Sequence, residues 1–95
     1  INPINIIRLD IITIIDYLHL IDEIDISLLF NLINDLKESM QQYHTFHPYF
    51  EEIDTLHHHI AQLSDFELHC KETINNLEEL FYSILMDFKR NLMGQ

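Results

Sequence analysis

The stretch NPINIIRLDIITIIDYLHLID, residues 2–22, decides the fold of this chain. Its apolar residues recur at alternating gaps of three and four, which is the spacing of a helix face packed into a bundle. That face consists of Ile4, Ile7, Ile11, Ile14, Leu18 and Ile21. Asn2 suits the N-cap position, and Pro3 suits the first helical position, where a missing N–H is tolerated. We therefore predict a helix over residues 3–22.

A second apolar stripe runs along the other side of this helix. Its residues are Ile6, Leu9, Thr13, Tyr17, Leu20 and Ile24. Burying its four large aliphatic side chains would contribute roughly 6–12 kcal/mol, which is comparable to the whole stability of a small domain, about 5–15 kcal/mol. Since a bundle buries one broad face of each helix, we expect the second stripe to contact another chain. The alternative is that this helix lies centrally and is covered on both sides within the monomer.

The rest of the chain predicts three further helices, over residues 26–43, 48–63 and 65–93. Asp25 and Pro48 mark two of the starts, and Ser64 with Glu67 forms the S-x-x-E capping box of the third. Gly94 is a C-terminal stop signal. Short turns between amphipathic helices predict an all-α, antiparallel four-helix bundle, with residues 1–95 as a single domain. In a rival arrangement the last helix reaches from a three-helix core to another subunit.

The last of these helices is the longest, so one of its ends is expected to extend beyond its neighbours. Its final turns contain Phe88, Leu92 and Met93. We expect these three residues to form an apolar tip beside the start of the first helix. Together with Ile6, Leu9, Tyr17, Leu20 and Ile24, this tip is the predicted partner-binding surface.

The charge balance of the chain is strongly acidic, with 5 basic and 16 acidic residues and a formal net charge of −11. Such a field repels nucleic-acid phosphate and anionic membranes, so neither is an expected partner. Charge also keeps a chain this apolar soluble. The alternative function is a small acidic inhibitor or immunity-type protein that blocks a basic, nucleic-acid-handling partner. Its candidate contacts are Asp16, Asp22, Glu23, Asp25, Glu51, Glu52 and Asp54.

Chemistry-bearing motifs are sparse. The one cysteine, Cys70, excludes an internal disulfide and is predicted to be a core residue. The chain has no glycine-rich phosphate loop and no uncharged run of membrane-spanning length. We therefore predict a non-catalytic, intracellular and cytoplasmic protein without a cofactor. Its predicted function is protein–protein interaction or oligomerisation.

Seven histidines suggest metal binding as a third possibility. His57, His58 and His59 are consecutive, so on a helix they point about 100° apart and cannot all bind one ion. Asp54 and His58 lie four residues apart, on one helix face, and are the weak candidate ligands. Solvated histidines are the simpler interpretation, and no metal site is predicted.

Overall fold

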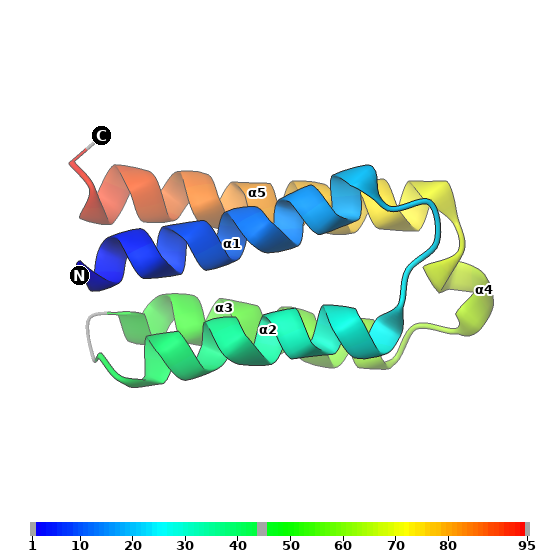
Figure 1. Cartoon of the computed structure of the whole chain (residues 1–95), viewed down its shortest axis with the longest axis horizontal. Coiled ribbons are helices and arrows are strands. Elements are labelled where there is room, and N and C mark those ends of the chain that lie inside the picture. The colour runs from blue at the N-terminus through cyan, green and yellow to red at the C-terminus, as the bar shows by residue number, and fades with distance from the viewer. Residues whose placement is uncertain (1, 44–45, 95) are drawn as a thin grey trace.

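The computed structural model describes residues 2–43 and 46–94, which form an all-helical bundle (Figure 1). The helices are α1 (Pro3–Leu20), α2 (Ile26–Gln41), α3 (His47–Ala61), the short α4 (Asp65–Leu68) and α5 (Lys71–Leu92). The four long helices run antiparallel, and α5 closes the ring against α1 and α3. The bundle measures 38 × 22 × 20 Å. The predicted antiparallel four-helix bundle is confirmed. The rival arrangement is not observed, because α5 packs within its own chain.

The helix ends follow the predicted capping residues. The Asn2 side chain accepts a hydrogen bond from the amide of Ile4 at 2.9 Å, and Pro3 opens α1. Asp25 is the N-cap of α2. Gly94 follows α5 with a φ of 73°, a left-handed conformation that glycine adopts without steric cost. The predicted ends of the first three helices were each about two residues too late, since α1 ends at Leu20, α2 at Gln41 and α3 at Ala61.

The core is built from one apolar side of each helix, which on α1 is the predicted side. Its buried members on the four long helices are Ile7, Ile11, Ile14, Ile15, Leu18, Leu29, Ile33, Leu36, Met40, Tyr49, Ile53, Leu56, Ile60, Ile74, Leu77, Phe81, Ile84, Leu85 and Phe88. Ile4, Ile21 and Leu63 pack at its margin. No helix among the described residues is both long and apolar enough to cross a membrane.

The prediction of one continuous helix over residues 65–93 was wrong. The Ser64–Glu67 capping box is present, but the helix that it starts ends after one turn. The amide of His69 donates to the carbonyls of Asp65 and Phe66, which closes that turn, and α5 begins at Lys71. Cys70 is consequently the N-cap of α5 and only partly buried, so its predicted place in the core was also wrong.

Candidate protein-interaction site

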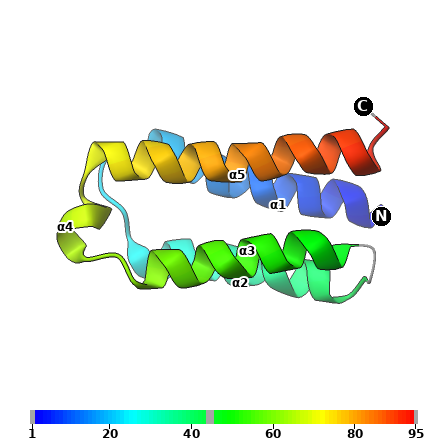
Figure 2. The same ribbon diagram turned by 180° about the vertical axis from the view of Figure 1, so that it is seen from behind.

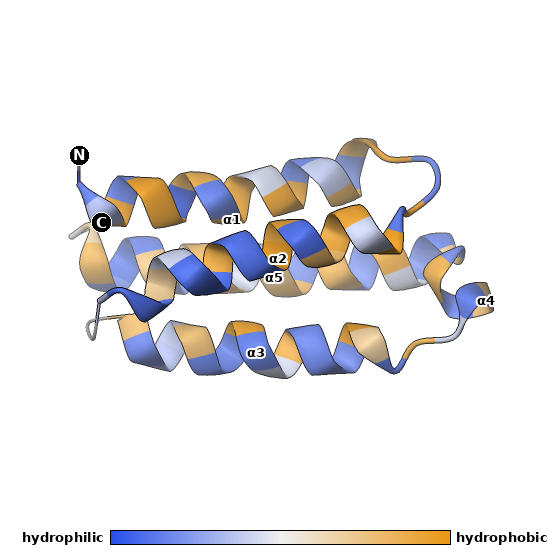
Figure 3. Cartoon of the chain, turned by 60° about the horizontal axis from the view of Figure 1, so that its bottom comes forward, coloured by the Kyte–Doolittle hydropathy of each residue, from blue (hydrophilic) through white to orange (hydrophobic). Residues whose placement is uncertain are grey.

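The outward side of α1 carries large apolar side chains that the bundle does not cover. Ile6 is 37% exposed, Leu9 53% and Leu20 77%. Thr13 lies between them and donates its hydroxyl hydrogen to the carbonyl of Leu9 at 2.8 Å. Hydrophobic residues recur along the whole of α1, whereas hydrophilic residues predominate along α3 (Figure 3). Ile6, Leu9, Thr13 and Leu20 are called the α1 surface below.

Two residues of the predicted stripe do not belong to this surface. Ile24 is buried, because the chain leaves the helix after Leu20 and turns back over the core. Tyr17 is partly buried, and its hydroxyl accepts a hydrogen bond from the amide of Asp25 at 2.8 Å. Tyr17 therefore holds the connection between α1 and α2. As a partner-binding residue, Ile24 was predicted wrongly.

The α1 surface extends toward the end of α2. A depression of about 130 Å³ lies between the first turn of α1 and the last turn of α2. Its lining residues are Pro3, Ile6, Ile7, Ser39, Gln42 and Tyr43. Tyr43 lies three residues after buried Met40 and so continues the apolar spacing of α2, but it is exposed because α2 ends at Gln41. Its ring thus adds apolar area beside Ile6.

The predicted apolar tip is largely internal. Phe88 is completely buried, with its ring centroid 5.8 Å from that of Phe46 and 5.4 Å from that of Tyr49. Leu92 packs at the margin of the core, and Met93 is 41% exposed. Phe88 was therefore predicted wrongly as a contact residue, because α5 does not overhang the bundle far enough to free its ring.

A groove of about 570 Å³ separates α3 from α5. Its lining residues are Glu51, Glu52, Thr55, Leu56 and His59 from α3, and Leu80, Ser83 and Ile84 from α5. We did not predict this α3–α5 groove from the sequence. The signal that could have indicated it is a pair of small polar residues, Thr55 and Ser83, on the facing sides of neighbouring helices.

The candidate acidic contacts do not form one patch. Asp22, Glu23 and Asp25 lie on the connection between α1 and α2, at one end of the bundle (Figure 1). Glu51 and Glu52 lie near the start of α3, toward the opposite end. The remaining two are Asp16, exposed on α1, and Asp54, partly buried on α3. A single partner surface could therefore use only some of the seven.

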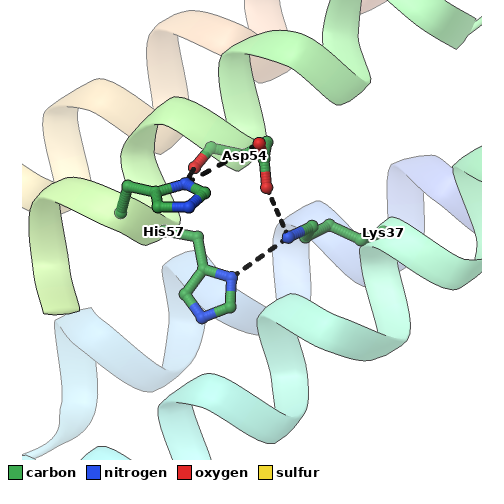
Figure 4. Close-up of polar contacts among 4 residues, drawn as sticks. Lys37, Asp54 and His57 are labelled. Atoms are coloured by element: carbon green, nitrogen blue, oxygen red, sulfur yellow. Dashed lines mark hydrogen bonds and ion pairs between the residues drawn. The ribbon is translucent and has the colours of Figure 1, made fainter.

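The carboxylate of Asp54, a weak candidate metal ligand, accepts a hydrogen bond from Lys37 (Figure 4). The ammonium of Lys37 donates to Oδ1 of Asp54 at 2.6 Å and lies 3.2 Å from Nδ1 of His57. Nδ1 of His58 lies 2.8 Å from the backbone carbonyl oxygen of Asp54 and 3.7 Å from Oδ2 of its carboxylate. Residues 2–43 and 46–94 contain no group of three or more His, Cys, Asp or Glu residues placed to hold a metal ion.

Lys37 links α2 to α3 from a position that is only 17% exposed at its side chain. Its hydrogen bond holds the pKa of Asp54 below the ordinary 3.8. Burial, followed by the nearby Lys37 charge, lowers the pKa of His57 below 6.5. The stabilisation from Asp54 is therefore present above about pH 3.8 and is lost as the pH falls through its lowered pKa. As the pH falls below about 6.5, the unfolded chain protonates at His57 first, which also destabilises the fold.

We expect Lys37→Met and Asp54→Asn to affect stability differently. Methionine keeps the apolar packing near the Phe50 ring and removes the cation, so the free energy of unfolding should stay within about 1 kcal/mol of wild type at pH 7. Asp54→Asn leaves the ammonium without its carboxylate and should be clearly less stable. In Lys37→Met the stability lost as the pH falls below about 4 should be smaller than in the wild type, because the pKa of Asp54 is no longer lowered by the lysine. Urea denaturation at several pH values measures both effects, and an Asp54→Asn protein as stable as wild type would contradict this account.

Comparison of the chain with protein-family models, with curated proteins and with solved structures finds no match. The function of the α1 surface and of the α3–α5 groove therefore has to be inferred from their exposure, shape and charge.

Proposed function

We propose that this protein is a non-catalytic interaction domain whose α1 surface pairs with a second copy of the chain. The observation that supports the proposal is the exposure of Ile6, Leu9 and Leu20 on one side of α1. Fully burying one such side chain contributes roughly 1.5–3 kcal/mol, and the monomer leaves a large part of that unrealised. Exposed apolar patches of this kind are typical of association surfaces.

The spacing along α1 favours pairing between two copies. Ile6 and Leu20 each lie seven residues from Thr13, on the same side of the helix. In an antiparallel pair of α1 helices with Thr13 at the centre, Ile6 of one copy meets Leu20 of the other. Because Thr13 is small, the two helices could approach closely at that point. The net charge of −11 on each copy opposes association, so added salt should strengthen it.

Sedimentation equilibrium over a range of concentrations tests the proposal. The mass of the wild type should rise from 11.4 kDa toward twice that value, and more readily in high salt. The double variant Leu9→Glu/Leu20→Glu should remain a folded monomer, because it places carboxylates in the contact. Asn31→Glu/Asn34→Glu is the matched control, since it adds the same charge at exposed positions of α2. A wild type that stays monomeric at every concentration, or a double variant that associates like wild type, would contradict the proposal.

A second candidate function is that of an acidic protein that blocks a basic partner. The observation that favours it is the position of Glu51 and Glu52 on the lining of the apolar α3–α5 groove. In this arrangement the two carboxylates lie beside a groove that an apolar side chain of the partner can enter. Binding of this kind should weaken as salt is added, which is the opposite of the dependence expected for self-association.

A further inference from the structure

The α3–α5 groove has the form of a binding site for a helix. α3 and α5 lie on the face of the bundle turned toward the viewer in Figure 2. The residues that line the groove come from these two helices. Buried Leu56 and Ile84 contribute apolar lining, and Leu80 is 47% exposed beside them. Thr55 and Ser83 are small and leave space above this apolar lining. An incoming apolar side chain would therefore meet aliphatic surface.

The length of the groove corresponds to a short helical segment. Its α3 lining runs from Glu51 to His59, which is about 12 Å at 1.5 Å per residue. That distance is about two turns of a docked helix. A helix bound in such a groove presents the side chains of residues i, i+3 or i+4, and i+7 to it. Three apolar side chains would therefore occupy the groove.

The charged side chains that line the groove are carboxylates. A second depression of about 270 Å³, lined by Glu78, Glu79, Tyr82 and Ser83, adjoins the groove through Ser83. Among residues 2–43 and 46–94, the lining of the two hollows includes four carboxylates and no lysine or arginine. Arg90, farther along α5, is paired with Asp87. This potential attracts a cationic partner and repels phosphate and anionic lipid.

We propose that the α3–α5 groove binds a basic amphipathic helix of another protein. Three apolar side chains of that helix enter the groove beside Leu80, and its flanking lysines or arginines pair with Glu51, Glu52 and Glu79. The inference rests on the second candidate function, contact of this groove with a basic partner, and specifies a helix as the form of that partner. It uses no residue of the α1 surface, so it and the proposed pairing through α1 can fail separately.

Fluorescence anisotropy with a designed peptide tests the proposal. The probe is a labelled peptide of about 18 residues, long enough to form a helix, with leucines at the i, i+3, i+4 and i+7 spacing and lysines beside them. A second peptide has the same composition with the leucines scrambled. At about 0.15 M salt the amphipathic peptide should bind at least about tenfold more tightly than the scrambled one. Equal affinities would show a non-specific charge effect and overturn the proposal, as would absence of binding.

Matched charge reversals locate the binding. Glu51→Lys/Glu52→Lys should weaken binding about tenfold or more, which corresponds to about 1.4 kcal/mol. Asp35→Lys/Glu38→Lys makes the same change in net charge at exposed positions of α2, which does not line the groove, and should change affinity by less than about twofold. If the first variant does not fold, Glu51→Gln/Glu52→Gln replaces it, with Asp35→Asn/Glu38→Gln as control. Equal losses at the two positions would overturn the proposal.

Matched apolar substitutions complete the test. Leu80 and Leu9 are almost equally exposed, at 47% and 53%, but Leu80 lines the groove and Leu9 belongs to the α1 surface. Leu80→Asp should weaken peptide binding about tenfold or more, whereas Leu9→Asp should leave it unchanged. The reverse result would place the peptide on α1 and overturn the proposal.

Discussion

Replacing Phe88 with alanine is expected to lower the free energy of unfolding by about 3–5 kcal/mol. The side chain is completely buried between Phe46 and Tyr49, so its removal leaves a cavity and breaks two aromatic contacts. A domain of this size has a total stability of about 5–15 kcal/mol, so the variant should lose a large fraction of it. Urea denaturation followed by far-UV circular dichroism measures the change.

The neighbouring Met93→Ala provides the control, because Met93 is exposed near the same end of α5. Its effect on the free energy of unfolding should be within about 0.5 kcal/mol. The pair of variants also separates the two interpretations of the end of α5. If the Phe88→Ala protein were as stable as wild type but no longer associated, the result would support the original prediction that Phe88 belongs to a partner-binding apolar tip.

Replacing Asp25 with alanine is expected to destabilise the fold by about 0.5–2 kcal/mol. The carboxylate of Asp25 accepts hydrogen bonds from the amides of Ser27 and Leu28 at 3.1 and 3.2 Å. Alanine would leave those amides of the first turn of α2 without this partner. The hydrogen bond from the amide of Asp25 to Tyr17 is retained, so the effect measures the cap alone. A lower melting temperature should report the loss.

Asp22→Ala is the matched control, because it removes the same charge from the same connection without removing the α2 cap. Its stability should be close to that of wild type. If the two variants were equally stable, the capping role of Asp25 would be wrong. Asp25 would then be available as a contact for a basic partner.

The bundle could be predicted from the sequence because local signals agree with one another. The spacing of Ile7, Ile11, Ile14 and Leu18 predicts the buried side of α1, and that side is buried. Caps such as Asp25 act within three residues of their own position, so they can be recognised without knowledge of the tertiary structure. The apolar pattern of each helix and the positions of the helix ends together leave few possible packing arrangements for a chain of this length.

The break between α4 and α5 could not be predicted, because nothing at His69 or Cys70 interrupts a helix by itself. Neither residue is glycine or proline, and the apolar spacing continues into α5. The interruption is stabilised by tertiary contacts: Leu68 is buried, and His69 Nε2 lies 3.3 Å from a carboxylate oxygen of Glu23. Packing of the turn against the bundle thus overrides a continuous helical pattern.

The surfaces were predicted less well than the core. An apolar stripe in the sequence shows which residues would gain stability from burial. Only the tertiary packing shows which of them are buried within the monomer. Ile24 and Leu20 looked equivalent in sequence, yet one is buried and the other is largely exposed. The contact between Lys37 and Asp54, and the α3–α5 groove, depend on how pairs of helices approach each other. Residues far apart in sequence carry no local signal of such contacts.

The order of the helices around the ring has a consequence for how fast the chain acquires its structure. α1–α2, α2–α3 and α3–α5 are pairs separated by short connections, and these can form as local hairpins within microseconds to milliseconds. Only α1 and α5 come from opposite ends of the chain, so their meeting closes a loop of about 50 residues. Closure of that loop is the slow, entropically costly event. Since the other helix pairs in contact are near neighbours in sequence, the α1–α5 contact is the main long-range step on the way to the native state.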